Sequence, residues 1–398
     1  MRLSLTPGWI DSWLLALALA CSAVAQPAAV TVRVENPLAE ARPDEVVAVS
    51  WAALRERLPG LAAGQVRVRE AATGREMTVQ VVDEDGDGAP DALLWLVHLW
   101  PEEVRHYAVE AAAPEQTPVA RAYARHDEER DDVAWESDRI AFRAYGQGLW
   151  QASAYEPLVS NGIDVWPKRV RDLVLERWYA LGHDAYHVDR GEGADFFSVG
   201  PSLGGGGTAV WHAGRMYPAR NFAAYRILAR GPIRAIVELV YEPWDAGGMT
   251  VSEVKRITID AGQHLFRAES VYAAEGADSL SFVVGFVKRP EGVVGAMRRE
   301  GDWAWLSTWG PVERKNGGHG HLGTAVLMPA ARLAGVHETE DHYLAQARAR
   351  SGEPAVHYVG AGWTASGDFD RVEDWWAYLD AFGRRLAAPL RITLLPSE

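Results

Sequence analysis

Apolar and polar residues alternate in short segments along most of the chain, and turn-forming residues separate these segments. Alternation with a period of two predicts β-strands that bury one face. Between residues 26 and 112 the segments are short, which predicts a small N-terminal β-module. Its expected strands are AVTVRVEN, EVVAVSW, GQVRVRE, MTVQVVDEDGDG, DALLWLVHL and HYAVEAA.

A polar, proline-bearing stretch follows this module and predicts a connector. From residue 131 to residue 398 the alternating segments are longer. They predict a mainly β protein whose larger part is an antiparallel β-sandwich, packed as one unit with the N-terminal module. Its expected strands include RIAFRAY, AAYRILARGPIRAIVELVYEPW, VSEVKRITID, HLFRAESVY and LSFVVGFV.

Two segments show a helical period instead. PKRVRDLVLERWYALG has Pro167 at its start and Gly182 after its end, which are typical helix boundaries. RVEDWWAYLDAFGRRL, residues 371–386, is the second predicted helix.

The first 25 residues have the pattern of a secretory signal peptide. Arg2 precedes the apolar run WLLALALA, and the small residues AVA precede Gln26. This order predicts export to the periplasm or the extracellular space. Cys21, the only cysteine, lies in this segment, so the mature protein is expected to have no disulfide. A lipid anchor at Cys21 is the alternative.

Composition adds two constraints. Hydrophobic residues make up 48% of the 398 residues, which is enough for a large packed core. The net charge of −14 repels polyphosphate and anionic lipid, so neither nucleic acid nor a membrane surface is an expected partner. The sequence does not indicate an oligomeric state.

Six segments of the chain carry a recognisable set of motifs, namely VVDEDGDGAPD (81–91), DDVAWESDRIAFRAYG (131–146), NGIDVWPKR (161–169), YHVDRGEGADFFSVGPSLGGGGTAVW (186–211), GAGWTASGDF (360–369) and VEDWWAYL (372–379). They resemble motifs of a family of secreted bacterial proteins catalogued as domain of unknown function 4861. Ser137 departs from the pattern, because members of that family tend to carry Asn there. Such proteins often accompany enzymes that degrade uronic-acid glycans, so the resemblance implies work on anionic carbohydrate.

A second resemblance concerns the fold. RAIVELVYEPW and VSEVKRITIDAGQHLFRAESVY are similar to strands of the galactose-mutarotase-like β-supersandwich. In that fold, long antiparallel strands carry sugar-binding side chains on a concave face. The resemblance therefore implies a sugar-binding concave sheet.

The segment that follows the first predicted helix is dense in polar side chains. Histidine exchanges protons near neutral pH, and carboxylates bind sugar hydroxyls. Glycines within the segment allow close backbone approach to a ligand. The segment is predicted to be either a functional site or an acidic exposed loop, and the sequence leaves both interpretations open. The residues are Tyr186, His187, Asp189, Glu192 and Asp195.

Cations beside aromatic rings form two further candidates for binding an anionic sugar. Lys168 and Arg169 follow Trp166, and they would grip a carboxylate while the ring stacks on a sugar face. Solvated residues at a helix start are the alternative. If residues 139–145 form a strand, Arg139, Arg143 and Tyr145 share one face. A sheet surface with structural salt bridges is the alternative, because it would show the same pattern of residues in the sequence.

Three other features have structural and functional readings. GGGG at 204–207 lacks the Lys-Ser/Thr of a phosphate loop, so a β-bulge or a close-packed turn is expected. Trp211 follows it and is a candidate ring for sugar stacking. His319 and His321 have no evident third metal ligand, which favours a loop.

An acidic loop has part of a calcium-binding pattern. Four aspartates occupy positions 1, 3, 5 and 9 of that spacing, but Leu94 replaces the bidentate glutamate at position 12. A structural calcium ion and a tight acidic hairpin both remain open, and no other cofactor is expected. The aspartates are Asp83, Asp85, Asp87 and Asp91.

Three functions remain open. The first is a polysaccharide or oligosaccharide lyase acting by β-elimination, in which Lys168, Arg169 or Arg143 neutralises a uronate and Tyr186 or His187 transfers protons. The second is a glycoside hydrolase that uses two carboxylates. The third is a non-catalytic or mutarotase-like sugar-binding protein. The candidate carboxylates for hydrolysis are Glu136, Asp189, Glu192 and Asp195.

Overall fold

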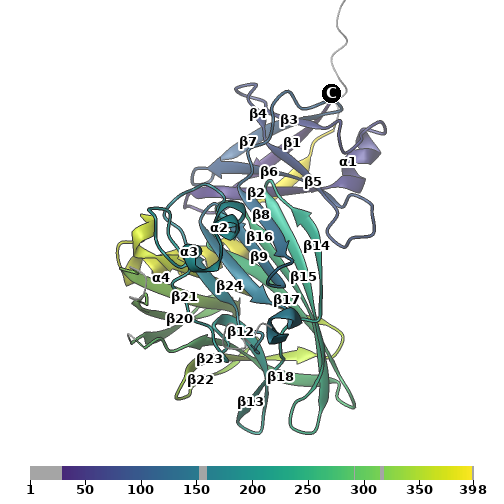
Figure 1. Ribbon diagram of the computed structural model, residues 1–398. Helices are drawn as coiled ribbons and strands as arrows, with labels where there is room; N and C mark the ends of the chain where they lie inside the picture. The colour runs from purple at the N-terminus through teal and green to yellow at the C-terminus, as the bar shows by residue number, and fades with distance from the viewer. Residues whose placement is uncertain (1–28, 152–158, 291, 314–317, 397–398) are drawn as a thin grey trace, which may run out of the picture.

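The computed structural model describes residues 29–151, 159–290, 292–313 and 318–396. The chain forms several antiparallel sheets with few helices, which confirms the mainly β prediction (Figure 1). The predicted signal peptide and Cys21 lie outside the described residues. No helix among the described residues is long and apolar enough to cross a bilayer.

The N-terminal module contains two small sheets that enclose their own apolar core (Figure 1). One sheet has the order β25-β1-β7-β3-β4 and the other β2-β6-β5. The C-terminal strand β25 (Arg391–Leu394) pairs with β1, so both ends of the described chain belong to this module. The other elements are β1 (Ala29–Glu35), β2 (Arg42–Ser50), α1 (Trp51–Arg57), β3 (Arg67–Glu70), β4 (Glu76–Met77), β5 (Val79–Val82), β6 (Ala92–Leu99) and β7 (Val104–Glu110).

The larger part is built on one eight-stranded sheet with the order β14-β15-β16-β17-β24-β21-β20-β19. Its central strands alternate buried and partly exposed residues, which leaves one face for a core and one for solvent or a covering helix. The strands are β14 (Ala224–Arg230), β15 (Arg234–Asp245), β16 (Thr250–Asp260), β17 (Leu265–Ala274), β19 (Val294–Glu300), β20 (Trp303–Pro311), β21 (His321–Pro329) and β24 (Pro354–Trp363).

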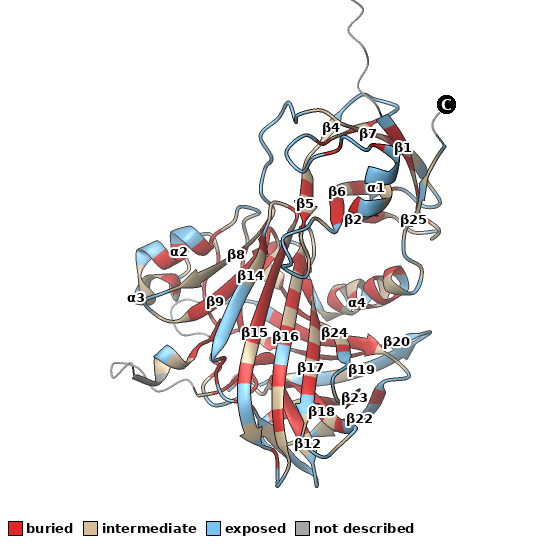
Figure 2. Ribbon diagram, turned by 90° about the vertical axis from the view of Figure 1, so that its right-hand side faces the viewer, coloured by how far each residue is buried: buried red, intermediate tan, exposed pale blue. Residues whose placement is uncertain are grey.

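Two smaller sheets cover the inner face of the large sheet. A single apolar core joins all three, and the red bands of the central strands mark it in Figure 2. Strand β8 lies within the stretch that we expected to be a connector. The four-stranded sheet contains β8 (Ala122–Asp127), β9 (Asp132–Ser137), β10 (Ile140–Tyr145) and β11 (Asp164–Pro167). The five-stranded sheet contains β12 (Gly205–His212), β13 (Arg215–Pro218), β18 (Ser279–Val287), β22 (Leu333–Glu338) and β23 (His342–Arg350).

The predicted C-terminal helix is present as α4 (Val372–Ala387). Its apolar stripe, which includes Trp375 and Leu379, packs on Leu265 and Trp305 of the large sheet. This contact covers part of the outer face. Two short 3₁₀ turns, η1 (Gln147–Gln151) and η3 (Thr364–Ser366), complete the described elements.

The other predicted helix is much shorter than its periodicity indicated. Residues up to Pro167 belong to β11, and the helical part is α2 (Leu175–Leu181) followed by α3 (His183–Tyr186). The reason is tertiary, because Glu136 on β9 accepts the backbone N–H groups of Val174 and Leu175 and so fixes the start of α2. Lys168 and Arg169 therefore do not lie at a helix N-terminus, contrary to the sequence reading.

The glycine run forms the expected β-bulge. The pairing of β12 with β18 shifts between Gly205 and Gly207, and Gly206 has a φ of +127°. A Cβ atom at Gly206 would collide with the side chain of Val359 on β24. Glycine is therefore required both by the backbone conformation and by the packing between the sheets.

We expect Gly206→Ala to lower the free energy of unfolding by about 2–4 kcal/mol, because strain and overpacking add. Gly214→Ala is the matched control, since Gly214 also has a positive φ, of +75°, but open space around it. Its cost is expected to be about 1 kcal/mol. Chemical denaturation measures both values, and equal losses would contradict the packing argument.

Candidate functional site

Arg143 on β10 is the centre of a buried polar cluster. Its Nη2 atom lies 2.6 Å from Asp164 and 3.0 Å from Asp195, and its Nη1 atom lies 3.4 Å from Asp132. All four side chains are almost completely buried. One guanidinium thus faces three carboxylates, and no positive charge remains for a ligand carboxylate.

The carboxylates of this cluster are not equivalent. Burial raises the pKa of Asp132 to about 7, although the charge of Arg143 opposes this shift. Asp164 makes the closer contacts, because its Oδ2 atom accepts from Arg143 and from the indole N–H of Trp166 at 2.9 Å. Asp132 is therefore the member of the cluster that holds a proton most readily.

Aromatic rings enclose the cluster. The guanidinium of Arg143 lies 4.9 Å from the ring centroid of Trp166, which stacks on Tyr186 at 4.8 Å. The hydroxyl of Tyr145 lies 3.4 Å from the Nη2 atom of Arg143. Trp166 is fully buried, so it supports the cluster and does not present a face to a sugar.

The hydroxyl of Tyr186 accepts hydrogen bonds from two arginines, at 2.6 Å from Arg130 and 2.9 Å from Arg143. Burial nevertheless raises the pKa of Tyr186 above its usual value. Tyr186 is therefore a neutral phenol that holds Arg130 in place. This makes it a positioning residue rather than the proton acceptor that the sequence suggested.

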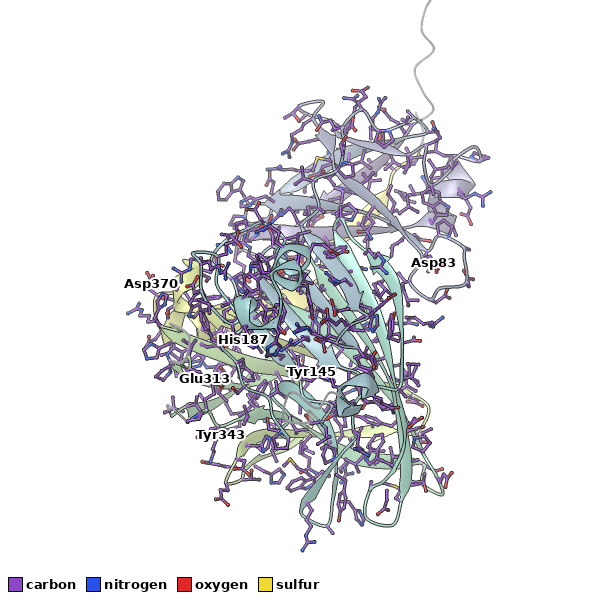
Figure 3. All side chains as sticks on the ribbon, in the orientation of Figure 1. Asp83, Tyr145, His187, Glu313, Tyr343 and Asp370 are labelled. Atoms are coloured by element: carbon purple, nitrogen blue, oxygen red, sulfur yellow. The ribbon has the colours of Figure 1, made fainter. Side chains whose placement is uncertain are left out.

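His187, which is labelled in Figure 3, is the more accessible group beside this cluster, with a side chain that is 21% exposed. Its Nδ1 atom lies 3.2 Å from the carbonyl oxygen of Asp195 and 3.3 Å from the carboxylate of the same residue. These acceptors favour the tautomer with the proton on Nδ1 and the lone pair on Nε2. Burial lowers the pKa of His187 to about 4, so the ring is neutral near pH 7.

A second imidazole faces His187. The Nε2 atoms of His187 and His183 are 3.5 Å apart, and both side chains remain partly exposed. Burial also lowers the pKa of His183, and the charge of Arg130 contributes to this. The two rings form a neutral histidine pair at the surface.

An open hollow of about 370 Å³ lies beside this pair. Arg130 and His183 line it, together with Asp127 and Gly182. No ion pair joins Arg130 to a carboxylate among the described residues, which distinguishes it from Arg143. Sequence reading missed Arg130 because it lies within the acidic run HDEERDD.

Arg169 and Asp189 form an ion pair above Trp363. The guanidinium lies 5.0 Å from the indole centroid and 3.3 Å from His319. Asp189 also accepts the backbone N–H groups of Gly191 and Gly193, at 2.8 Å and 3.1 Å. Both charges are thus used to hold the 189–193 turn.

Lys168 has a structural role that the sequence did not reveal. Its Nζ atom lies 2.7 Å from Glu136 and 2.8 Å from the carbonyl oxygen of Ser137. The side chains of Lys168 and Glu136 are fully buried. Lys168 therefore balances the carboxylate that fixes α2 and is not placed to bind a ligand.

The other predicted site residues lie apart from the histidine pair. Arg139 is 3.0 Å from both Asp44 and Asp368, and joins the N-terminal module to the larger part. Glu192 is 2.7 Å from Arg177. Trp211 stacks on His337 at 4.5 Å, on the five-stranded sheet. The structure brings together Arg143, Tyr145, Trp166, Tyr186, His187 and Asp195.

The carboxylates considered for hydrolysis are all engaged. Asp195 binds Arg143, Asp189 binds Arg169, and Glu192 accepts from Arg177 and Trp178. Glu136 is enclosed with Lys168. Among these four, no two unengaged carboxylates face each other across an opening.

Residues 34–392 match the model of a family described as Domain of unknown function (DUF4861). The chain belongs to this family. It is 32% identical over 345 residues to "Uncharacterized protein P7" of Formosa agariphila, an alignment that covers 82% of this chain and 84% of the relative. The family assignment confirms the resemblance noted in the sequence.

Two solved structures from Enterococcus faecalis show a looser likeness, each with 10% sequence identity over 93% of this chain. One is an alpha-mannosidase from strain V583, with a TM-score of 0.43 and 46% of its chain covered. The other is a protein in glycosyl hydrolase family 38, with a TM-score of 0.47 and 48% covered. The DUF4861 chain thus spans about half the length of these structures.

Ser137, the departure from the family pattern, uses its hydroxyl in two directions. It donates to the carbonyl oxygen of Gln263 at 2.7 Å and accepts the backbone N–H of Arg139 at 3.0 Å. A single hydroxyl therefore satisfies a buried acceptor and a backbone donor. This accounts for a polar residue at the end of β9.

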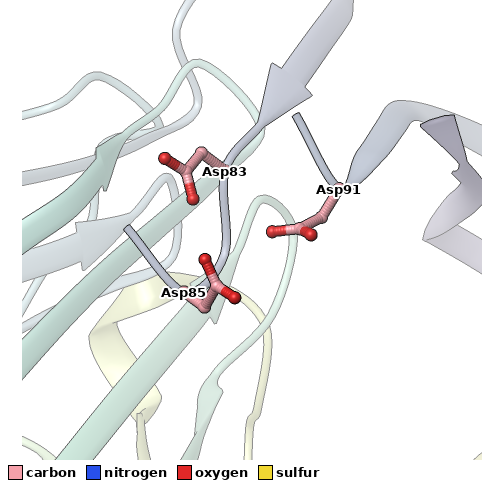
Figure 4. A group of neighbouring side chains, drawn as sticks. All are labelled: Asp83, Asp85 and Asp91. Carbon is pink, nitrogen blue, oxygen red and sulfur yellow. The ribbon is translucent and has the colours of Figure 1, made fainter. Parts of the chain in front are cut away.

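The acidic loop brings three of its four aspartates together. One carboxylate oxygen each of Asp83, Asp85 and Asp91 lies within 4.8 Å of the others (Figure 4). Asp87 instead accepts the backbone N–H of Ala89 at 2.7 Å. Asp83 lies far from His187 (Figure 3), so a cation bound here would stabilise the loop and take no part at the histidine pair.

We expect Lys168→Met to lower the free energy of unfolding by about 3–5 kcal/mol, because Glu136 would remain buried without its counter-charge. Arg177→Met is the matched control, since its ion pair with Glu192 is largely solvated and worth about 1 kcal/mol or less. Denaturant titration compares the two variants. If Lys168→Met has the same free energy of unfolding as the wild-type protein, the ion pair does not stabilise the fold.

The calcium hypothesis predicts binding heat in an isothermal titration of the metal-free protein. Asp85→Asn should abolish this heat because it removes one of the three converging carboxylates. Asp87→Asn should retain it, since Asp87 points away from the cluster. If the wild-type protein shows no binding heat, the calcium hypothesis is wrong and the loop is an acidic hairpin without a metal.

Proposed function

We propose that this protein is carbohydrate-active and cleaves uronic-acid-containing glycans by β-elimination at the His187 site. One observation carries the proposal. The neutral, oriented imidazole of His187 faces His183, and His183 lines an open hollow together with Arg130, which forms no ion pair with a carboxylate among the described residues. A uronate lyase needs a base and a cation in this relation.

The cation acts first. The carboxylate of a uronate binds the guanidinium of Arg130, whose charge makes the neighbouring C5 proton more acidic and stabilises the enolate-like transition state. Arg143 cannot serve in this role because three carboxylates surround it. Tyr186 contributes by holding Arg130 through its hydroxyl.

Proton transfer follows at the histidine pair. The Nε2 lone pair of His187 takes the C5 proton, and those C–H electrons form the C4=C5 double bond. The C4–O bond breaks with its electrons on the leaving oxygen, which then takes a proton. That proton comes back from His187 directly or through His183, whose ring lies 3.5 Å away, so the enzyme ends unchanged.

Substrate charge supports this chemistry. Burial lowers the pKa of both histidines, and the positive charges of Arg130 near His183 and of Arg143 near His187 act in the same direction. A bound carboxylate offsets part of this positive potential and raises both pKa values toward the range of an effective base. The site thus becomes more basic when an anionic substrate is bound. Neutral sugars lack this effect and are expected to be poor substrates.

Two further points support the proposal. The first favours elimination over hydrolysis, and the second concerns an extracellular role. Paired carboxylates act on glycosides only when both face the scissile bond, and the four candidates are engaged elsewhere. The predicted signal peptide would bring the protein to polymers that do not enter cells.

The test is a digestion of a uronate oligosaccharide panel, followed by the ultraviolet absorbance of the unsaturated product. We expect His187→Ala to lower kcat about 10²–10⁴-fold. Arg130→Met should lower kcat/KM about 10²–10³-fold. Arg190→Met is the matched control, because Arg190 is an exposed arginine of the neighbouring turn, and it should retain activity within about threefold.

Three results would contradict the proposal. No gain in absorbance across the panel would exclude elimination, and new reducing ends without absorbance would indicate hydrolysis. Tight binding without turnover would indicate a sugar-binding protein. A pH profile adds a check, because the wild-type enzyme should lose activity in acid only as the pH approaches about 4, where the free His187 is protonated.

A further inference from the structure

A second hollow, of about 460 Å³, lies on the outer face of the large sheet. The N-terminal module contributes Glu45, and α4 contributes Arg385 and Phe382. Figure 2 shows the module and α4 beside the same end of β16 and β17. Its volume is within the range of small-molecule sites, about 300–1,000 Å³.

The floor of this hollow is set by strand register. Thr258 on β16 lies opposite Arg267 on β17, and Arg267 lies opposite Tyr358 on β24. Because side chains alternate across a strand, these residues share the outer face with Arg256 and Asp260. The sheet therefore presents a row of polar groups that ends at an aromatic ring.

The charges that line the hollow balance. Four arginines, Arg234, Arg256, Arg267 and Arg385, lie with four acids, which are Glu45, Glu84, Asp260 and Glu269. Without an excess of positive charge the hollow does not suit phosphate or a polyanion. Leu265, Tyr358 and Phe382 add apolar surface. Polar groups of both kinds beside a flat apolar surface match a sugar ring, which has hydroxyls at its rim and C–H groups on its faces.

Two buried polar atoms in this lining make no hydrogen bond among the described residues. They are Nη2 of Arg385 and Oε2 of Glu45. Arg385 is only 8% exposed, and its Nε atom lies 3.9 Å from Glu45, beyond hydrogen-bond range. Buried donors and acceptors normally form hydrogen bonds, so this donor and this acceptor, whose side chains share only a long ion pair, indicate that a ligand binds there.

Glu45 is also perturbed electrostatically. Burial raises its pKa, and nearby Asp260 adds to this effect. A carboxylate oxygen accepts a hydrogen bond from a hydroxyl, and a guanidinium donates one. Arg385 and Glu45 together can therefore bind two neighbouring hydroxyls of one sugar.

We propose that the hollow between the N-terminal module, α4 and the large sheet is a saccharide-binding site, in which Arg385 and Glu45 bind adjacent hydroxyls and Tyr358 packs on the ring. In Figure 2, α4, which contributes Arg385 to the hollow, lies on the other side of β15 and β16 from α3, which contains His183. It does not depend on the proposed lyase activity. Such a site would hold a glycan chain while another part of the chain reacts.

The test is isothermal titration with neutral disaccharides, namely cellobiose, maltose and mannobiose, and with digalacturonate as the anionic probe. We expect at least one neutral disaccharide to bind. Arg385→Met should weaken this binding at least about tenfold, because it removes the charged donor. His187→Ala should leave it unchanged, which separates this site from the proposed active site.

A second pair of variants guards against loss of folding in Arg385→Met. Thr258→Val keeps the volume of a floor residue and removes its hydroxyl, and it should weaken binding a few-fold. Thr250→Val makes the same change on the same strand outside the hollow and should have no effect. The proposal is overturned if no neutral disaccharide binds, if only digalacturonate binds, or if Arg385→Met and Thr258→Val both bind like the wild-type protein.

Discussion

The enclosure of Arg143 by three carboxylates is the interaction on which the candidate site depends. Asp132 lies on β9, Asp164 on β11 and Asp195 in the loop after α3, so one guanidinium joins three segments of the chain. Removing one member would leave buried charge unbalanced, at a cost of about 3–5 kcal/mol. Asp195 also orients His187, so the same contact that holds the loop sets the tautomer of the imidazole.

Burial separates the cations of this protein into two kinds. Lys168 and Arg143 are enclosed and paired, and they stabilise the fold. Arg130 lines an open hollow. Among the described residues, its guanidinium forms a side-chain hydrogen bond only with the hydroxyl of Tyr186. The chemistry proposed for uronates needs the second kind, because only a cation without a protein counter-charge gains from binding a carboxylate. The large sheet separates this region from the hollow at Arg385, so the two proposed glycan sites lie on different surfaces of the chain.

Local patterns predicted much of the fold. Period-two alternation indicated the strands of both parts, and VEDWWAYLDAFGRRL predicted α4, because these signals arise within single segments. The helix predicted from Pro167 to Gly182 was wrong over its first half. Its periodicity was real, but β11 includes Pro167 and residues 169–172 form bends, because Glu136 on another strand binds Lys168 and the backbone N–H groups at which α2 begins.

The sequence by itself determined the mainly β class and the irregular strand at the glycine run, and it named Arg143, Tyr186, His187 and Asp195 as candidates, since residue type and spacing carry that information. Tertiary structure alone decided which groups are accessible. It enclosed Lys168 and Trp166, left Arg130 open within an acidic run, and formed the hollow at Arg385 from three distant segments. Charge pairing and burial act through space, and no local pattern records which residues become neighbours.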